Sequence, residues 1–239
     1  VCVVKGTIKD YNGKYLDVKT CEIVEDEPLD EYLESKYNFP QYEKLFWKTL
    51  QTNLSEKGFA LLEKILKDEN TNIYDRFSKE FAAQKFHDNC PNGLFAHTCK
   101  CLMHMQNYIK IYPMVYKYRG AEKEDYIKDL LFISITLHDI GKIMEMEYGI
   151  YTDRSFLTHR LLGIELLFNY KDEIINTYDQ EWYDYFLSVI AQHHGAYAEE
   201  ARTLPAMIIH LIDEFESTSP YLSEQLRGNI ELHACGETV

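Results

Sequence analysis

The sequence predicts a mainly α-helical protein with a short β-hairpin at its N-terminus, and three observations support this. From Pro40 onward, apolar residues recur at helical spacing in successive segments. The first 24 residues alternate instead, and an Asn-Gly turn divides them. The chain shows no alternation of strands with helices, no glycine-rich phosphate loop and no internal repeat. These features predict a helical bundle rather than an α/β fold.

Residues 1–24 read as strand, turn and strand around Asn12-Gly13, which is the strongest short-range signal for a hairpin. This is the only locally basic piece of the chain, with Lys5, Lys9, Lys14 and Lys19. A two-stranded hairpin is barely stable alone. We therefore expect it to pack on the helices or to belong to a sheet whose other strands are absent from this sequence.

Residues 25–39 form an acidic linker, and residues 40–239 form the helical domain. Helices are expected at 41–53, 56–68, 72–86, 94–111, 122–139, 156–177, 180–194 and 203–217. Asn72, Asp153 and Thr158 offer side chains that cap helix N-termini, and Pro113 ends the 94–111 helix. Gly141 lies where a helix C-terminal glycine belongs.

Composition limits the classes of function. The 239 residues can hold one substantial core or one core with a small appendage. No apolar run approaches the roughly 20 residues that span a bilayer, so no membrane association is expected. The net charge of −14 argues against a broad nucleic-acid-binding surface. It still allows a phosphate-bearing substrate that metals and a few bases hold locally.

The six cysteines contain no CxxC pair, so we read them as free thiols: Cys2, Cys21, Cys90, Cys99, Cys101 and Cys235. Free thiols indicate a reducing compartment and hence a cytoplasmic protein. The chain has no initiator Met and no basic-then-apolar leader. We therefore expect Val1 to begin a fragment or a processed chain.

The most informative stretch is LHDIGK at 137–142, which follows a long apolar run at 126–136. Neighbouring helical residues point about 100° apart, so His138 and Asp139 serve a single metal awkwardly. They serve a pair of metals well, since a carboxylate can bridge two ions roughly 3.5–4 Å apart. The alternative reading is a surface helix end with a chance His-Asp pair, and with Lys142 placed there only because lysines favour helix C-termini.

Histidines and acids also gather in the other predicted helices. His97 and His104 lie seven residues apart on one face, and His210 and Asp213 lie three apart. His159 opens the 156–177 helix, while His193 and His194 close the 180–194 helix. One histidine on an apolar helix is usually a core residue, but several on facing helices are what a metal site inside a bundle needs.

Five strings in this order resemble the HD-domain metal-dependent phosphohydrolases, and more closely the YhaM-type 3′-5′ exoribonucleases within that superfamily. They are GLFAHT at 93–98, LHDIGK at 137–142, FLTHRLLG at 156–163, HHG at 193–195 and TLPAMIIHLID at 203–213. The resemblance covers about residues 75–239 and implies an HD-domain helical bundle. That family carries an OB-fold before its HD domain, and VKGTIKDYNGK at 4–14 resembles the last strands of one. Because an OB-fold has five strands, we expect a remnant or fragment of it.

Carried over residue by residue, the resemblance implies seven metal ligands: His97, His138, Asp139, His159, His193, His194 and Asp213. Asp139 would bridge two divalent ions. Seven ligands with one bridging give about eight bonds, whereas two octahedral ions offer about twelve, which leaves room for water and phosphate oxygens. Imidazole-rich ligation favours Mn, Fe, Co, Ni or Zn over Mg.

The resemblance also implies roles beside the ions. The residues concerned are the catalytic Asp139, Lys142 and His87, the supporting His210, and the phosphate contacts Lys142, Arg160 and Arg202. Lys142 would stabilise charge on the phosphoryl group. His87 would contact phosphate or protonate a leaving group, with a core or capping histidine as the alternative. His210 would orient Asp213 or a ligand histidine.

The implied function is a two-metal phosphodiesterase that acts on single-stranded RNA or short oligonucleotides from the 3′ end. One alternative is a hydrolase of nucleoside phosphates or cyclic nucleotides, and another is a non-enzymatic metal-stabilised module. The sequence departs from the family beside the expected substrate cleft. The loop at 196–202 is short and acidic, and Pro205 replaces a usual glutamate.

Overall fold

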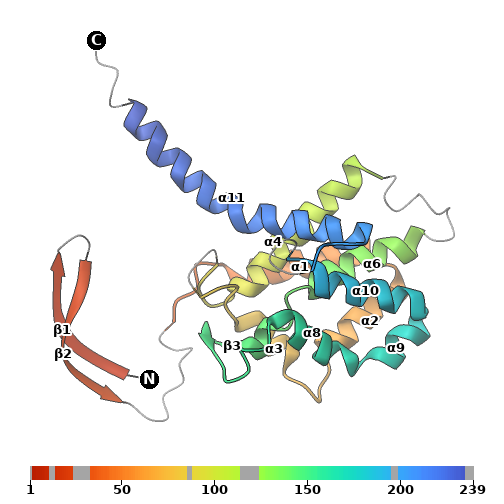
Figure 1. Ribbon diagram of the computed structural model, residues 1–239, viewed down its shortest axis with the longest axis horizontal. Helices are drawn as coiled ribbons and strands as arrows, with labels where there is room; N and C mark the ends of the chain where they lie inside the picture. The colour runs from red at the N-terminus through yellow and green to blue at the C-terminus, as the bar shows by residue number, and fades with distance from the viewer. Residues whose placement is uncertain are drawn as a thin grey trace. The chain divides into compact units, whose positions relative to one another are not determined.

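The computed structural model describes residues 2–10, 14–23, 33–84, 88–113, 124–194 and 199–234. The chain divides into two compact units, residues 1–34 and residues 35–239. The expected mainly α-helical fold with an N-terminal hairpin is confirmed (Figure 1). Most of the expected linker at 25–39 lies outside the described residues, and the domain boundaries remain a prediction.

The first unit contains the antiparallel strands β1 (Cys2–Asp10) and β2 (Lys14–Ile23). Cys2 pairs with Ile23 at the open end, and Asp10 pairs with Lys14 beside the turn. The register shifts between Lys5 and Gly6, as at a β-bulge. Two strands do not build the five-stranded barrel of an OB-fold. The relation of this hairpin to an OB-fold is not confirmed.

The second unit is a bundle of helices, and a small β-hairpin lies between two of them in the sequence. Its helices are α1 (Phe39–Asn53), α2 (Glu56–Leu66), α3 (Ile73–Lys79), α4 (Gly93–Ile111), α6 (Glu124–Leu137), α7 (Lys142–Glu145), α8 (His159–Phe168), α9 (Lys171–Thr177), α10 (Gln180–Gln192) and α11 (Leu204–Ala234). The hairpin joins β3 (Met146–Glu147) to β4 (Ile150–Tyr151). Within the described part of the chain, no helix is long and apolar enough to cross a membrane.

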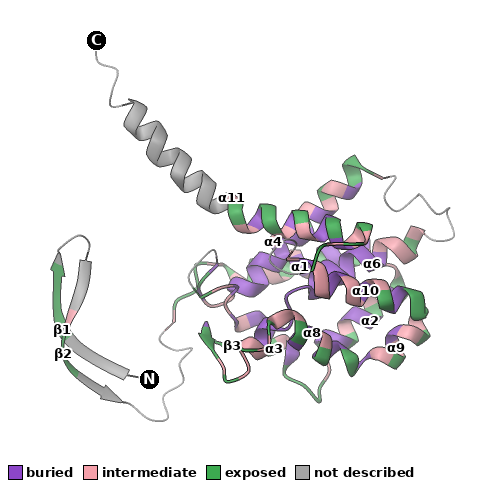
Figure 2. Ribbon diagram, in the orientation of Figure 1, coloured by how far each residue is buried: buried purple, intermediate pink, exposed green. Residues whose placement is uncertain are grey.

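Helix α6 runs through the centre of the bundle. Nine consecutive residues, from Asp129 to Leu137, are buried, so no face of this stretch meets solvent (Figure 2). Helices α1, α4, α10 and α11 all pack against it. The C-terminal end of α6 therefore lies in the protein interior, and so do the residues that follow it.

Two predicted helices have boundaries that differ clearly from expectation. The predicted 72–86 helix stops at Lys79, because Glu80 is extended and buried and its carboxylate accepts the backbone N–H of Gly149 at 2.8 Å. The predicted 156–177 helix begins only at His159 and breaks before Lys171 into α8 and α9. The break occurs where Tyr170 turns into the core and its hydroxyl donates to Asp68, 2.9 Å away.

The interpretation of Gly141 as a helix C-terminal glycine was wrong. Helix α6 ends earlier, at Leu137, and Gly141 has a right-handed backbone (φ −67°) at the start of α7. Its lack of a side chain matters for another reason. A Cβ atom at this position would lie 1.8 Å from the carbonyl oxygen of His159 and 2.4 Å from the nitrogen of Gly163. Glycine therefore allows α8 to pack directly on the turn after α6.

Two further helices differ from expectation at their C-terminal ends. The predicted 180–194 helix ends at Gln192, so His193 and His194 lie in a turn. The predicted 203–217 helix continues to Ala234 as α11.

A buried carboxylate on α6 connects three parts of the bundle. Asp129 accepts hydrogen bonds from the backbone nitrogen of Ser55 (2.8 Å) and the hydroxyl of Tyr178 (2.7 Å), and from the Ser55 hydroxyl. Ser55 caps the N-terminus of α2, so one carboxylate fixes α2 and the end of α9 to α6.

We expect Asp129→Ala to lower the free energy of unfolding by about 3 kcal/mol, because it leaves buried donors without acceptors. Urea denaturation measures the change. Asp125→Ala, at an exposed position on the same helix, is the matched control and should change stability by less than about 0.5 kcal/mol. Equal losses in the two variants would contradict this role of Asp129.

Candidate metal centre

Five segments bring the seven expected ligands together inside the second unit. His97 lies near the start of α4, His159 opens α8, and Asp213 lies on α11. His138 and Asp139 follow the last residue of α6, and His193 and His194 follow the last residue of α10. A helix end turns two adjacent side chains inward more easily than a helix interior does, because the residues after the last turn leave the 100° spacing.

Asp139 is the centre of the cluster, and its two oxygens face different histidines. Its Oδ2 lies 3.4 Å from Nε2 of His138 and 3.7 Å from Nε2 of His97. Its Oδ1 lies 3.4 Å from Nε2 of His159 and 3.5 Å from Nε2 of His193. One buried carboxylate thus divides the imidazoles into two sets.

Two groups of donor atoms follow from this division, each with its atoms within 4.8 Å of one another. The first donor group is His97, His138, Asp139 and Asp213. The second donor group is Asp139, His159, His193 and His194. Asp139 is the one residue that belongs to both groups, and a shared carboxylate is the usual bridge between paired metal ions.

Several buried atoms of the cluster lack hydrogen-bond partners in the described residues: Nε2 of His138, Nε2 of His193 and Oδ1 of Asp139. Buried polar atoms in native proteins nearly always have a partner. The Nδ1 atoms of the two histidines lie 2.8 and 2.9 Å from the carbonyl oxygens of Ile135 and Ile190, so they carry the protons. Each Nε2 therefore presents a lone pair to the centre, which is the tautomer that binds a metal. The residues fit divalent metal binding.

The electrostatics around two of the expected ligand histidines favour the neutral form of the imidazole. Burial lowers the pKa of His193 to about 4, and burial together with the neighbouring His193 lowers the pKa of His194 to about 3. Both imidazoles are therefore neutral at neutral pH, as metal ligation requires. Burial acts to raise the pKa of Asp139, but the Lys142 ammonium at 2.7 Å outweighs burial and holds this pKa well below its usual range.

Two further predicted residues support the turn that carries His193 and His194. Nδ1 of His210 lies 2.8 Å from the carbonyl oxygen of His193. The guanidinium of Arg160 donates to the carbonyl of Ala191 at 2.7 Å. Both side chains thus hold the C-terminal end of α10, and the phosphate contact expected of Arg160 remains a prediction.

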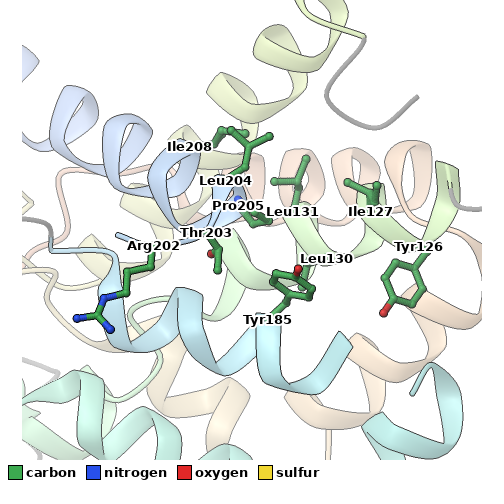
Figure 3. Close-up of a pocket in the computed structure, with 10 residues that line it drawn as sticks. All are labelled: Tyr126, Ile127, Leu130, Leu131, Tyr185, Arg202, Thr203, Leu204, Pro205 and Ile208. Carbon is green, nitrogen blue, oxygen red and sulfur yellow. The ribbon is translucent and has the colours of Figure 1, made fainter. Parts of the chain in front are cut away.

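The other predicted substrate residues lie apart from this turn or outside the described chain. Arg202 is exposed at one end of an apolar cavity of about 320 Å³ between α6, α10 and the start of α11 (Figure 3). Its backbone nitrogen donates to the side chain of Gln192, the residue before His193. Pro205 lines the same cavity. His87 lies outside the described residues, so its expected role remains a prediction.

The structure adds two carboxylates that the sequence analysis missed. Glu216 accepts a hydrogen bond from Nδ1 of His97, and Glu145 lies 2.9 Å from Nδ1 of His159. Glu216 stands three residues after Asp213, so helical spacing could have placed it on the same face. No sequence signal distinguishes Glu145 from a solvated acid. Burial acts to raise the pKa of Glu216, but His97 and Lys100 outweigh burial and lower it to about 2.

A helical bundle whose segments converge on one buried, shared aspartate is typical of proteins that bind a pair of metal ions. A family model described as the HD domain matches residues 95–218, just over half of the chain. The chain therefore belongs to the HD-domain family, and it is a metal-dependent phosphohydrolase. The family resemblance expected from the sequence is confirmed.

Curated relatives support this assignment. The chain is 23% identical over 241 residues to the 3′-5′ exoribonuclease YhaM of Listeria welshimeri, covering 93% of this chain and 70% of that protein. It is 23% identical over 232 residues to YhaM of Oceanobacillus iheyensis, with 93% and 69% covered. With YhaM of Shouchella clausii the identity is 28% over 148 residues, covering 59% and 43%. No solved structure matches the chain significantly.

Proposed function

We propose that the chain is a two-metal phosphodiester hydrolase that shortens single-stranded RNA or short oligonucleotides from the 3′ end. The observation that carries the two-metal part is the sharing of Asp139 between two donor groups, with one oxygen facing each. The substrate part is supported by the exoribonuclease relatives, which align over 93% of this chain.

The first donor group would hold one ion with two histidines and two carboxylates, and the second would hold another with three histidines and the shared Asp139. When bound, such ions act as Lewis acids toward phosphate oxygens and lower the pKa of water. The high share of imidazole favours Mn, Fe, Co, Ni or Zn over Mg. Burial of His97, His138, Asp139 and His193 excludes bulk water from most of the site, which strengthens its electrostatics.

Lys142 is the residue that would stabilise charge on the phosphoryl group. Its ammonium is buried and lies 2.7 Å from Oδ2 of Asp139, beside both donor groups. Burial acts to lower the pKa of Lys142, but Asp139 raises it, so the side chain is charged at neutral pH. A positive charge preorganised in a buried site is effective where negative charge develops.

We expect Lys142→Met to lower kcat by about 100-fold with a smaller change in KM, as for loss of one preorganised donor. Steady-state kinetics on the metal-loaded protein measures both values, and metal analysis separates a catalytic effect from loss of ions. Lys44→Met, at an exposed position on α1, serves as the control. An unchanged kcat with full metal content would exclude the role proposed for Lys142.

The charge of the chain favours a second candidate function, the hydrolysis of small nucleotides. The net charge of −14 suits small nucleotides better than an extended RNA strand, because counterion release from phosphates drives strand binding. Nucleoside phosphates or cyclic nucleotides need only a local pocket.

A substrate panel distinguishes the candidates. The Mn- or Fe-loaded protein is assayed against 5′-labelled single-stranded RNA, single-stranded DNA, nucleoside triphosphates and cyclic dinucleotides, with Asp139→Ala as the background control. A ladder of RNA products shortened from the 3′ end, with the small nucleotides untouched, is the expected result. Hydrolysis of small nucleotides alone would contradict the exoribonuclease proposal and support the second candidate function.

A further inference from the structure

Glu216 lies behind His97, one of the seven expected metal ligands, and takes no part in the chemistry proposed for the two ions. It stands on α11 with only 3% of its surface exposed. Its Oε2 accepts the hydrogen bond of His97 Nδ1, and the imidazole itself is fully buried on α4. With Nδ1 engaged in this way, Nε2 of His97 faces Oδ1 of Asp213 at 3.1 Å. Glu216 thus fixes both the tautomer and the orientation of His97, a member of the first donor group.

An ion pair holds Glu216 in place. Its Oε1 lies 2.5 Å from Nζ of Lys100, which stands three residues after His97 on α4. The same ammonium lies 2.8 Å from Oδ2 of Asp88, whose other oxygen accepts the hydroxyl of Tyr37. A buried carboxylate without a counter-charge is strongly unfavourable. Lys100 therefore allows an ionised Glu216 to stand in the core.

The supporting contacts differ among the ligand histidines. His138 and His193 donate to backbone carbonyl oxygens, which carry no net charge. His97 donates to a carboxylate, and a charged acceptor makes an imidazole a stronger metal donor than a carbonyl does. In the second donor group the corresponding contact is made by Glu145, which lies 2.9 Å from His159 Nδ1. Each donor group therefore has one histidine supported by its own carboxylate.

We propose that Glu216, held by Lys100, is a positioning residue that orients His97 and strengthens binding of the ion in the first donor group. The inference rests on the two-metal function proposed above. Loss of such a supporting carboxylate typically weakens metal affinity by about 10- to 100-fold. Glu216→Gln is expected to lower the affinity for the ion in the first donor group by this factor and to leave the affinity for the other ion unchanged.

The experiment isolates each donor group before testing Glu216. Asp213→Asn removes a ligand that only the first group contains, and His194→Ala removes one that only the second group contains. Metal-free proteins are titrated with Co²⁺, and binding is followed by calorimetry and by the visible absorption of the ion. In the His194→Ala background, Glu216→Gln should lower the affinity for the ion that remains in the first donor group. In the Asp213→Asn background, where the remaining ion lies in the second donor group, Glu216→Gln should leave the affinity unchanged.

Three controls keep the outcomes separable. Glu145→Gln should show the opposite selectivity, because it supports His159 in the second group. Glu63→Gln makes the same charge change on the exposed surface of α2, where the carboxylate pairs only with Lys67 among the described contacts. Thermal unfolding of each metal-free variant reports whether the bundle remains folded. If Glu216→Gln fails to fold, Glu216→Asp takes its place, since the shorter side chain keeps the charge beside Lys100 and withdraws the carboxylate from His97.

The results then decide between the two claims. Equal Co²⁺ affinities with and without Glu216→Gln, or with and without Glu216→Asp if that variant is used, would overturn the positioning role and leave the two-metal function standing. Fewer than two ions bound by the unmodified protein would overturn the two-metal function itself.

Discussion

An Asp139→Asn variant is expected to bind less than one metal ion per chain and to lose activity by about three orders of magnitude or more. The reason is that both oxygens of Asp139 are used, one toward each donor group. Asparagine keeps the shape of the side chain but has one oxygen and no charge. It therefore cannot bridge two cations, and both groups lose their common ligand.

Metal analysis after reconstitution with Mn or Fe, together with the RNA assay, measures both effects. Asp213→Asn is the informative comparison, since it belongs to the first donor group alone and should leave one ion bound. Asp184→Asn, at an exposed position on α10, controls for the charge change. Two ions retained by Asp139→Asn would be incompatible with a bridging role.

A Gly141→Ala variant is expected to lose about 3 kcal/mol of unfolding free energy or more, because the added methyl group overpacks a rigid contact. The new Cβ would lie 1.8 Å from the oxygen of His159 and 2.4 Å from the nitrogen of Gly163. Both are backbone atoms, so relief requires a shift of α8. Since His159 Nε2 lies 3.4 Å from Asp139 Oδ1, that shift would also disturb the second donor group.

Gly163 offers a matched control from the other side of the same contact. Its nearest neighbours to an added Cβ lie at 3.4 Å, which is close to ordinary van der Waals distance. Alanine is also favoured over glycine inside a helix by about 0.5–1 kcal/mol. Gly163→Ala should therefore be nearly neutral in urea denaturation. Similar losses for both alanine variants would show that the close approach at Gly141 does not limit stability.

The sequence predicted the elements whose signals are local. Helices such as α4 and α10 were placed within two residues of their ends because their apolar spacing is regular. The early end of α3 could not be predicted in this way. It depends on Glu80 accepting the N–H groups of Tyr148 and Gly149, which lie nearly seventy residues further along the chain. The β3–β4 hairpin has strands of two residues, too short for any alternation to show.

The residues of the candidate site were likewise predicted only in part from the sequence. The seven ligand positions were proposed from motif strings, and the structure brings all seven into two overlapping donor groups. Glu216 and Glu145 were missed because an acid in a helical stretch reads as part of a solvated face. Their roles depend on partners 119 and 14 residues away. Arg160 donates to the carbonyl of Ala191, and the phosphate contact expected of it remains a prediction.

The two helices that end at the metal centre have a consequence for the order of binding. Both α6 and α10 direct their C-termini toward the cluster, since His138 and His193 follow their last residues. The aligned peptide dipoles place about half a negative charge at each such end. These two helix ends therefore favour cations, whereas the N-terminus of α8, which His159 opens beside Asp139, favours an anion. Bound ions should accordingly neutralise the ends of α6 and α10 and leave the N-terminus of α8 to attract phosphate, so that the affinity for an anionic substrate rises once the protein is loaded with metal.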